Sequence, residues 1–253
     1  MAIITLLTDF GTADTYVAEV KAVLLSRAPD ARLVDLSHEV LPGDVRTAQY
    51  LLARAWSRFP AGTVHLVVVD PGVGTERRAL AASAEGHYFV APDNGVLSVV
   101  SAGARFISLP VLRDASPTFH GRDVFAPAAA RLAAGGRFET LGSRITDPRA
   151  VPLRTPRREG RAVVGEVIHV DHFGSLVSNI PPDLVEPDMV LLVKGQQVGG
   201  LRRTFADVAS GQPLAYVGSA GTVEIAVRDG SATRLLGVGI GAEIRGQAVP
   251  DAR

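Results

Sequence analysis

Three short segments in the first half of the chain combine acidic, basic and hydroxyl side chains with glycines. They are Thr8-Asp9-Phe10-Gly11 with Asp14 and Tyr16 close behind, Asp70-Pro71-Gly72-Val73-Gly74 with Arg77, and Thr118-Phe119-His120-Gly121-Arg122-Asp123. The carboxylates can accept hydrogen bonds from hydroxyl or ammonium groups of a ligand, and the glycines allow a ligand to approach the backbone closely. His120 adds a group that exchanges protons near neutral pH. These segments are the candidates for a site that acts on a small molecule.

Each segment also has a purely structural interpretation. Asp14 and Asp123 each stand just before an expected helix, where an aspartate commonly caps the first turn. Asp70-Pro71-Gly72 is ordinary turn chemistry, with Arg77 in a surface ion pair. The pattern around His120 is equally consistent with a hydrogen-bonded histidine beneath a loop. The residues alone leave both interpretations open.

Several other kinds of site are disfavoured by the sequence. The chain has no cysteine, so disulfides and thiolate ligands are excluded. No Gly-Lys-Ser/Thr follows the glycines at 72–74, and no GxGxxG follows the first expected strand. Ser219 lies between two short expected strands, which is not the strand-to-helix turn of a nucleophile elbow. The missing phosphate-binding motifs argue against a triphosphate or dinucleotide, and we expect no cofactor. We also predict no required metal, since the remaining histidines lack metal-ligand spacing: His38, His65, His87, His169 and His172.

Composition favours a small-molecule ligand over a polyanionic partner. The 253 residues include 26 Lys+Arg and 26 Asp+Glu, so the formal net charge is zero and nothing suggests binding to nucleic acid or to an anionic membrane. The first residues lack the basic region of a signal peptide, and no apolar run approaches the ~18 residues that a membrane helix needs. We expect a cytoplasmic protein.

The elements that must position these segments alternate between strand and helix. Apolar runs predict strands at 3–7, 32–36 and 63–69, and helical spacing predicts helices at 17–27 and 44–58. We expect further strands at 80–83 and 87–90 and helices at 95–100 and 124–134. This pattern predicts an α/β domain with a mainly parallel sheet, in which ligands bind beyond the carboxyl ends of the strands.

The second part of the chain has a different pattern. A proline- and arginine-rich stretch at 147–160 has no strand or helix period, so we predict an N-terminal α/β domain at 1–150, a linker at 151–161 and a C-terminal domain at 162–253. That domain has little helical pattern and is expected to be a smaller β-barrel-like domain. Its expected strands are 162–170, 189–193, 214–217, 222–227 and 236–240.

Five motifs in order resemble the S-adenosylmethionine (SAM) hydroxide adenosyltransferase family, which is related to the SAM-dependent fluorinase and chlorinase. They are Leu7-Thr8-Asp9-Phe10-Gly11, Val69-Asp70-Pro71-Gly72-Val73-Gly74, Ala91-Pro92-Asp93-Asn94-Gly95, the segment from Thr118 to Asp123, and Asp171-His172-Phe173-Gly174-Ser175 with Ser178-Asn179. The resemblance implies an α/β domain followed by a β domain. It also implies a homotrimer whose sites bind SAM between one subunit's first domain and a neighbour's second domain.

By the same resemblance, water attacks the ribose 5′ carbon of SAM and releases adenosine and L-methionine. Asp70, Arg77 and His120 match the catalytic set of the hydrolytic members. A sulfonium is already a good leaving group, so these residues need only orient the water and stabilise its hydroxide character. Which group takes the proton is left open.

The resemblance also assigns substrate contacts. Asp9 matches the residue that binds the ribose hydroxyls, and Asp171 is suited to the methionine ammonium of a neighbour's site. Ser219 matches a contact to the methionine carboxylate, although the surrounding stretches 218–221 and 227–229 depart from the family pattern. The remaining expected substrate-binding residues are Phe10, Asp14, Tyr16, Thr118, Phe119, Phe173, Ser175 and Asn179.

Other functions remain as alternatives. A halogenase using chloride shares the fold, but the fluorinase has a different residue in place of Asp70 and an insertion where this chain runs directly from Arg78 to His87. An anionic Asp70 would also repel a halide. A SAM or adenosine sensor without catalysis, a structural trimer, and an Asp/His hydrolase of another substrate are the further alternatives.

Overall fold

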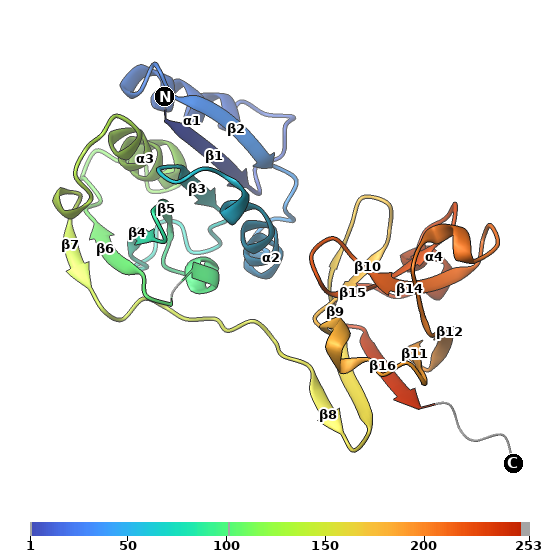
Figure 1. The fold of residues 1–253 in the computed structure, drawn as a ribbon. Coiled ribbons are helices and arrows are strands. Elements are labelled where there is room, and N and C mark those ends of the chain that lie inside the picture. The colour runs from blue at the N-terminus through green and yellow to red at the C-terminus, as the bar shows by residue number, and fades with distance from the viewer. Residues whose placement is uncertain (1, 101, 249–253) are drawn as a thin grey trace, which may run out of the picture. The chain divides into compact units, whose positions relative to one another are not determined.

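The computed structural model describes residues 2–100 and 102–248, and it divides into two compact units, Met1–Leu153 and Arg154–Arg253. Each unit has its own apolar core. A single chain segment joins the two units (Figure 1). No helix among the described residues is long and apolar enough to cross a membrane.

The first unit is a seven-stranded mixed sheet with helices on both faces. The strand order is β2-β1-β3-β5-β4-β6-β7, parallel from β2 to β5 and antiparallel beyond. The α/β class predicted from the sequence is confirmed. The strands are β1 (Ile3–Thr8), β2 (Arg32–Ser37), β3 (Val64–Val68), β4 (Ala79–Ala84), β5 (His87–Pro92), β6 (Arg105–Leu109) and β7 (Ser143–Ile145).

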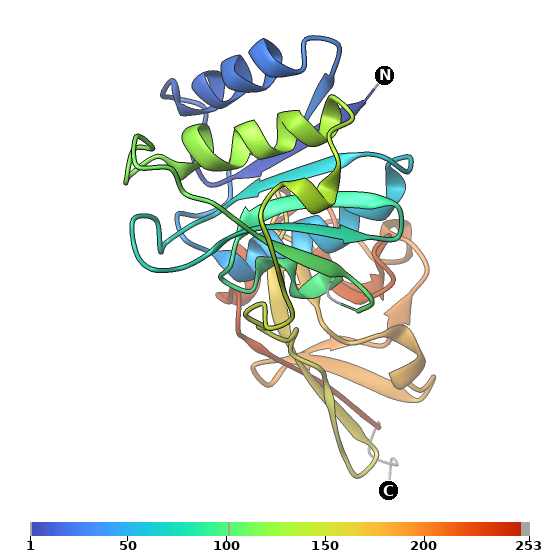
Figure 2. The same ribbon diagram turned by 90° about the vertical axis from the view of Figure 1, so that its left-hand side faces the viewer.

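Alternation along the strands determines which helix covers each face. Ile4 and Leu6 of β1 pack with α1 (Tyr16–Arg27) and α3 (Ala126–Ala133), whereas Leu7 packs with α2 (Val45–Ala55). Figures 1 and 2 show α1 and α3 side by side on one face of the sheet and α2 on the other. The C-terminal ends of β1 and β3 lie together, because Thr8 pairs with Val68.

Short helical turns complete this unit, and two of them differ from the expected helices. The stretch expected to be a helix at 95–100 is a 3-10 helix, Val96–Val100, and α3 is preceded by a π-helical turn, Gly121–Phe125. Two further 3-10 turns are Trp56–Arg58, which continues α2, and Phe138–Thr140.

The second unit is a nine-stranded sheet that curls on itself. Its order is β12-β11-β16-β9-β10-β15-β14-β13, with β8 paired to β9, and β12 contacts β14. The prediction of a β-barrel-like second domain agrees with this arrangement. The elements are β8 (Arg157–Glu159), β9 (Ala162–Val170), β10 (Leu176–Ser178), β11 (Met189–Val193), β12 (Gln196–Gly199), β13 (Leu201–Arg202), β14 (Pro213–Val217), β15 (Val223–Val227), α4 (Ala232–Leu236) and β16 (Glu243–Ala248), with 3-10 turns Pro182–Leu184 and Phe205–Asp207.

Two local predictions in this part of the chain are wrong. The expected strand at 236–240 is instead the end of α4 and a turn, because the Ser231 side chain caps the helix and Gly237 ends it with a left-handed φ of 63°. Within the expected linker, Arg157–Glu159 form β8, whose backbone pairs with β9. Tertiary pairing supplies hydrogen bonds that the arginine-rich sequence did not indicate.

Candidate active site

Asp70, Arg77 and His120 lie in direct contact in the first unit. Asp70 stands two residues after β3, Arg77 two residues before β4, and His120 directly before the π-helical turn. Arg77 Nε donates to Asp70 Oδ1 at 2.9 Å, and Nη2 donates to Asp70 Oδ2. The same Nη2 donates to Nδ1 of His120 at 2.9 Å. The guanidinium therefore joins the carboxylate and the imidazole.

Burial and charge set the protonation of His120. The residue is only 5% exposed, and its pKa is lowered first by burial and then by the neighbouring Arg77 cation. A guanidinium has no acceptor, so Nδ1 of His120 must accept the hydrogen bond from Arg77. We assign His120 as a neutral ring with its proton on Nε2, which leaves Nε2–H as a hydrogen-bond donor.

The ion pair itself is almost closed off from solvent. The side chains of Arg77 and Asp70 are 9% and 6% exposed, and the Arg77 guanidinium also lies over the Phe125 ring, 5.2 Å from its centroid. Within the part of the chain that the structure describes, Nη1 of Arg77 is buried and has no hydrogen-bond partner. It is a spare hydrogen-bond donor on the side of the guanidinium away from Asp70.

Asp9 follows β1 and is held by a neighbouring loop. Its Oδ2 accepts from the backbone N–H of Gly43 at 2.8 Å. Its pKa is raised chiefly by burial, with a smaller contribution from the negative charge of Asp70. Two carboxylates from adjacent parallel strands thus face one region, as expected at the carboxyl edge of such a sheet.

The segment at 38–43 was not expected to contribute to the site. The His38 ring bonds the Thr8 hydroxyl at 2.8 Å through Nδ1, and the His38 carbonyl accepts from Gly11 N at 2.8 Å. Together with Gly43, this segment holds the loop that carries Asp9. No sequence motif marks it, because the contacts join positions about thirty residues apart, as between Thr8 and His38.

Three aromatic side chains pack together in the same unit. Phe10, Tyr16 and Phe119 have ring centroids 5.3 to 6.0 Å apart, with tilted or edge-to-face geometry. Phe119 is buried, whereas Tyr16 is 48% exposed. A Cβ on Gly121 would lie 3.2 Å from the Phe10 ring, so glycine allows this close packing beside His120. The three rings form an apolar wall next to the catalytic candidates.

The helix-cap interpretations of Asp14 and Asp123 are wrong. The N-cap position of α1 is Thr15, with no side-chain cap bond, and Asp14 lies outside it in an exposed turn. Asp123 is inside the π-helical turn, where its carboxylate accepts from Ser116 N at 2.8 Å and from Arg122. Asp123 thus braces the loop that carries Thr118, whose hydroxyl bonds that of Ser116 at 3.3 Å.

Gly74 brings two of the candidate segments into contact. Its φ is +78°, and a Cβ added there would lie 2.7 Å from the carbonyl oxygen of Pro117. Only glycine tolerates both the backbone conformation and this distance. The loop at 70–77 therefore lies directly against the segment that carries His120.

Five of the expected substrate contacts lie in the second unit, and three of them share the turn that follows β9. Asp171 Oδ1 accepts from the backbone N–H groups of Phe173 and Ser175, at 3.0 and 2.7 Å. This turn leaves the Phe173 ring 76% exposed and buries Ser175. Ser219 is exposed in the turn between β14 and β15.

Asn179 has a structural role in this unit. Its Oδ1 accepts from Glu166 N at 2.9 Å and its Nδ2 donates to Arg154 O at 3.0 Å. Both ends of the amide are therefore used by the backbone. That Asn179 contacts substrate stays a prediction.

A hydrogen-bonded pair of the half-buried Tyr216 and the buried Glu224 beside the Asp171 turn was not predicted from the sequence. The Tyr216 hydroxyl donates to Glu224 Oε2 at 2.6 Å, and Glu224 is 6% exposed. The pKa of Tyr216 is raised, first by burial and then by Glu224, while a hydrogen bond from Ser175 opposes the shift. A glutamate within the apolar run of β15 was the available signal for an inward-facing carboxylate.

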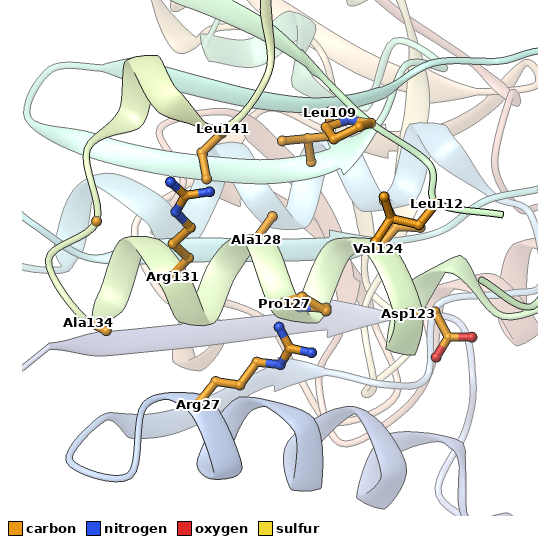
Figure 3. A pocket seen from close by; sticks show the side chains of 12 residues that line it. Arg27, Leu109, Leu112, Asp123, Val124, Pro127, Ala128, Arg131, Ala134 and Leu141 are labelled. Atoms are coloured by element: carbon orange, nitrogen blue, oxygen red, sulfur yellow. The ribbon is translucent and has the colours of Figure 1, made fainter. Parts of the chain in front are cut away.

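A cavity of about 650 Å³ lies elsewhere, beside α3. Figure 3 shows mostly apolar side chains around it, with the guanidinium groups of Arg27 and Arg131 and the carboxylate of Asp123. Asp70, Arg77 and His120 do not line it. We place the candidate site by its chemistry, because volume alone does not supply reactive groups.

Comparisons with family models match both halves of the chain. The SAM hydroxide adenosyltransferase N-terminal domain matches residues 4–142, and the corresponding C-terminal domain matches residues 165–245.

Known proteins of similar sequence cover nearly the whole chain. An (R)-S-adenosyl-L-methionine hydrolase from Salinispora tropica is 42% identical over 252 residues, with 96% of each chain covered, and one from Thermus thermophilus is also 42% identical, with 94% of this chain covered and 97% of the relative. A fluorinase from Actinoplanes sp. is 29% identical, with 88% and 90% covered. A solved structure of an uncharacterized conserved protein from Thermotoga maritima superposes with a TM-score of 0.90 at 41% identity, covering 96% of this chain and 99% of that one.

Proposed function

Because this chain belongs to the SAM hydroxide adenosyltransferase family, we propose that it is an enzyme that hydrolyses SAM to adenosine and L-methionine. The similarity to hydrolases at 42% identity, against 29% for a fluorinase, supports water as the nucleophile. The observation that carries the proposal is the contact of Asp70, Arg77 and His120 through one guanidinium.

The proposed reaction is a displacement at the ribose 5′ carbon. A water oxygen forms the new bond to C5′ as the C5′–S bond breaks, and the bonding electron pair goes to sulfur, which becomes the neutral thioether of methionine. SAM carries its own activated leaving group, so the reaction needs no metal or cofactor. One proton is released for each sulfonium consumed.

The three residues have complementary roles in this proposal. Asp70 accepts a hydrogen bond from the attacking water and orients it, and Arg77 holds the Asp70 carboxylate in place through Nε and Nη2. Neutral His120 offers Nε2–H as a further donor. These groups position the nucleophile and stabilise the hydroxide character that develops on it, in a site from which solvent is largely excluded.

Substrate contacts come from both units in the proposed complex. Asp9 binds the ribose hydroxyls, and Phe10, Tyr16 and Phe119 pack against the apolar part of SAM. We propose that the chain is a homotrimer in which Asp171, Phe173, Ser175 and Ser219 of a neighbouring copy complete the site. The exposed Phe173 ring is suited to burial by such a partner.

A halogenase is the second candidate, and one local feature disfavours it. The chain turns from β4 to β5 through only Glu85 and Gly86, both with positive φ, as in a tight two-residue hairpin. The insertion expected of the fluorinase has no counterpart in this turn. A buried carboxylate at Asp70 would also repel a halide ion.

The test is chromatography of purified protein incubated with SAM, without chloride and with added chloride. Adenosine and methionine in equal amounts without chloride support the proposal. If chlorodeoxyadenosine forms only when chloride is present, the protein is a halogenase. If SAM binds and no product forms, the protein is a sensor. Asp70→Ala, Arg77→Ala and His120→Ala should retain SAM binding by calorimetry while losing most turnover.

Shared sites between copies can be tested by complementation. Asp70→Ala and Asp171→Ala subunits, each of low activity alone, are unfolded together and refolded as a mixture. Recovered activity supports a site built from two copies, and light scattering should give three times the 26.6 kDa chain mass. No recovery, or a monomer mass, would contradict the trimer.

A further inference from the structure

The Asp93-Asn94-Gly95 turn after β5 has no role in the proposed reaction, yet it contacts both ends of the loop that carries the catalytic pair. We propose that Asn94 and Asp93 are positioning residues that hold Asp70 and Arg77 in the geometry needed for turnover. The inference rests on the proposed function, whose site it deepens. It is carried by hydrogen bonds at the two ends of residues 70–77.

Asn94 holds the start of the loop. Its Nδ2 donates to the carbonyl oxygen of Val69 at 2.8 Å, while its Oδ1 accepts from Val96 N at 3.1 Å. Strand β3 ends at Val68, and its pairing with β5 ends earlier, at Leu66, so Val69 lies beyond the sheet ladder. The Val69 carbonyl belongs to the peptide unit that leads into Asp70. Rotation of that unit would turn the Asp70 carboxylate away from Arg77.

Asp93 holds the end of the loop through Arg78. Its Oδ2 accepts from Arg78 Nε at 2.7 Å, and its backbone N–H donates to the Arg78 carbonyl at 2.9 Å. Its other oxygen accepts from Arg149 N at 2.7 Å, and the Asp93 side chain is only 5% exposed. Arg78 also donates to Asp147. The residue that follows Arg77 is therefore fixed by side-chain and backbone bonds at once.

One turn thus fixes both ends of the loop between Asp70 and Arg77. The two hydrogen bonds that join these residues depend on the relative placement of the loop ends. Reacting groups lose much of their effect when displaced by about 1 Å, which can cost about 10²-fold in rate. Loss of the Asn94 bond to Val69 should therefore lower turnover although Asn94 touches none of the catalytic side chains.

The test compares two Asn94 variants with a control on the same turn. Asn94→Asp keeps the acceptor for Val96 N and loses the donor to Val69, and Asn94→Ala loses both. The control is Gln49→Ala, since the buried Gln49 amide donates to Gly95 O and Val151 O and so supports the turn from its other side. SAM hydrolysis and melting temperature are measured for all three.

We expect kcat to fall by about 10- to 100-fold in both Asn94 variants, with KM for SAM within about twofold of wild type. Gln49→Ala should lower the melting temperature and leave kcat within about twofold. Wild-type kcat in both Asn94 variants overturns the proposal. So does an equal loss of kcat in Gln49→Ala, because the effect would then be general weakening of the turn.

A second measurement separates this inference from the proposed function. The ¹⁵N–¹H signal of Arg77 Nε, identified by its loss in Arg77→Lys, reports the bond to Asp70 without any substrate. We expect this signal to shift in both Asn94 variants and to stay in place in Gln49→Ala. If wild type does not cleave SAM, the proposed function fails, and this signal alone decides whether Asn94 positions the pair.

Discussion

Arg77 donates a hydrogen bond through Nη2 to Nδ1 of His120 across 2.9 Å. Because arginine can only donate, the bond requires an unprotonated Nδ1 and keeps His120 neutral with its proton on Nε2. The same guanidinium holds Asp70. One arginine therefore determines both the orientation of the carboxylate and the tautomer of the histidine.

Replacing Arg77 by lysine keeps the positive charge and removes the planar guanidinium. The variant therefore tests whether charge alone is enough to orient Asp70 and His120. A lysine ammonium is a compact donor that cannot reproduce the planar fork between Asp70 and His120. We expect Arg77→Lys to lower kcat by about 10²-fold or more, with a smaller effect on SAM binding. Arg105→Lys, at an exposed ion pair with Glu139, is the matched control and should retain wild-type kcat. Equal kcat in Arg77→Lys and wild type would show that charge alone suffices.

The pH dependence of kcat/KM should reflect His120. Its pKa is lowered below the ordinary 6.5 by burial and by Arg77, so the neutral form is favoured in the folded protein. Activity should persist as the pH falls through 6.5 and be lost only at lower pH, when Nδ1 is protonated and can no longer accept from Arg77. The residual activity of His120→Gln should not show this loss at low pH. If the loss at low pH is unchanged in that variant, another group causes it.

Gly74→Ala should affect both stability and turnover. The left-handed φ costs a non-glycine residue about 1 kcal/mol or more, and the added Cβ would also press on Pro117 O. Gly211 has the same φ of +78° with no atom within 4 Å of an added Cβ, so Gly211→Ala bears only the backbone cost. We expect melting temperatures to fall in both variants, further in Gly74→Ala, and kcat to fall in Gly74→Ala alone. A similar kcat in the two variants would mean that the contact with Pro117 does not position the site.

Buried histidines on β3 and β5 should make the first unit sensitive to acid. His65 bonds Thr5 through Nδ1 at 2.8 Å and His87 through Nε2 at 3.2 Å. Burial, and then the neighbouring His87, lowers the pKa of His65 to about 3. Between about pH 6.5 and about pH 3 the unfolded chain binds one more proton at His65 than the folded chain does. The contribution of His65 to the free energy of unfolding is therefore fully present above pH 6.5 and is lost as the pH falls through this range.

Urea unfolding at several pH values from about 7 to about 4 measures this dependence. One proton corresponds to a slope of about 1.4 kcal/mol per pH unit. His65→Gln should be less stable at neutral pH and should show a shallower slope in acid. A slope equal to that of wild type would mean that His65 does not take up the proton on unfolding.

Much of the arrangement follows from local sequence pattern. Apolar alternation and helical spacing identified β1, β3, β5, α1 and α2, because burial of one face imposes a period on the residues that form it. Asp9 and Asp70 were found because polar groups directly after parallel strands gather at one edge of the sheet. Family motifs then joined these segments to His120. These features depend on neighbours along the chain, or on motifs in fixed order.

Features that depend on distant partners required the tertiary structure. The Arg77–His120 bond spans 43 positions, and the Asn94 amide holds a carbonyl 25 positions away. The neutral state of His120 depends on how deeply the fold buries it beside a cation. Asn179 bonds a backbone amide and a backbone carbonyl, and Asp123 bonds the Ser116 amide as well as the Arg122 side chain. No motif reveals these partners. The sequence by itself determined which residue types reach the edge of the sheet, whereas packing decided which of them meet and in what protonation state, because hydrogen bonds and desolvation depend on distances between segments and not on their order.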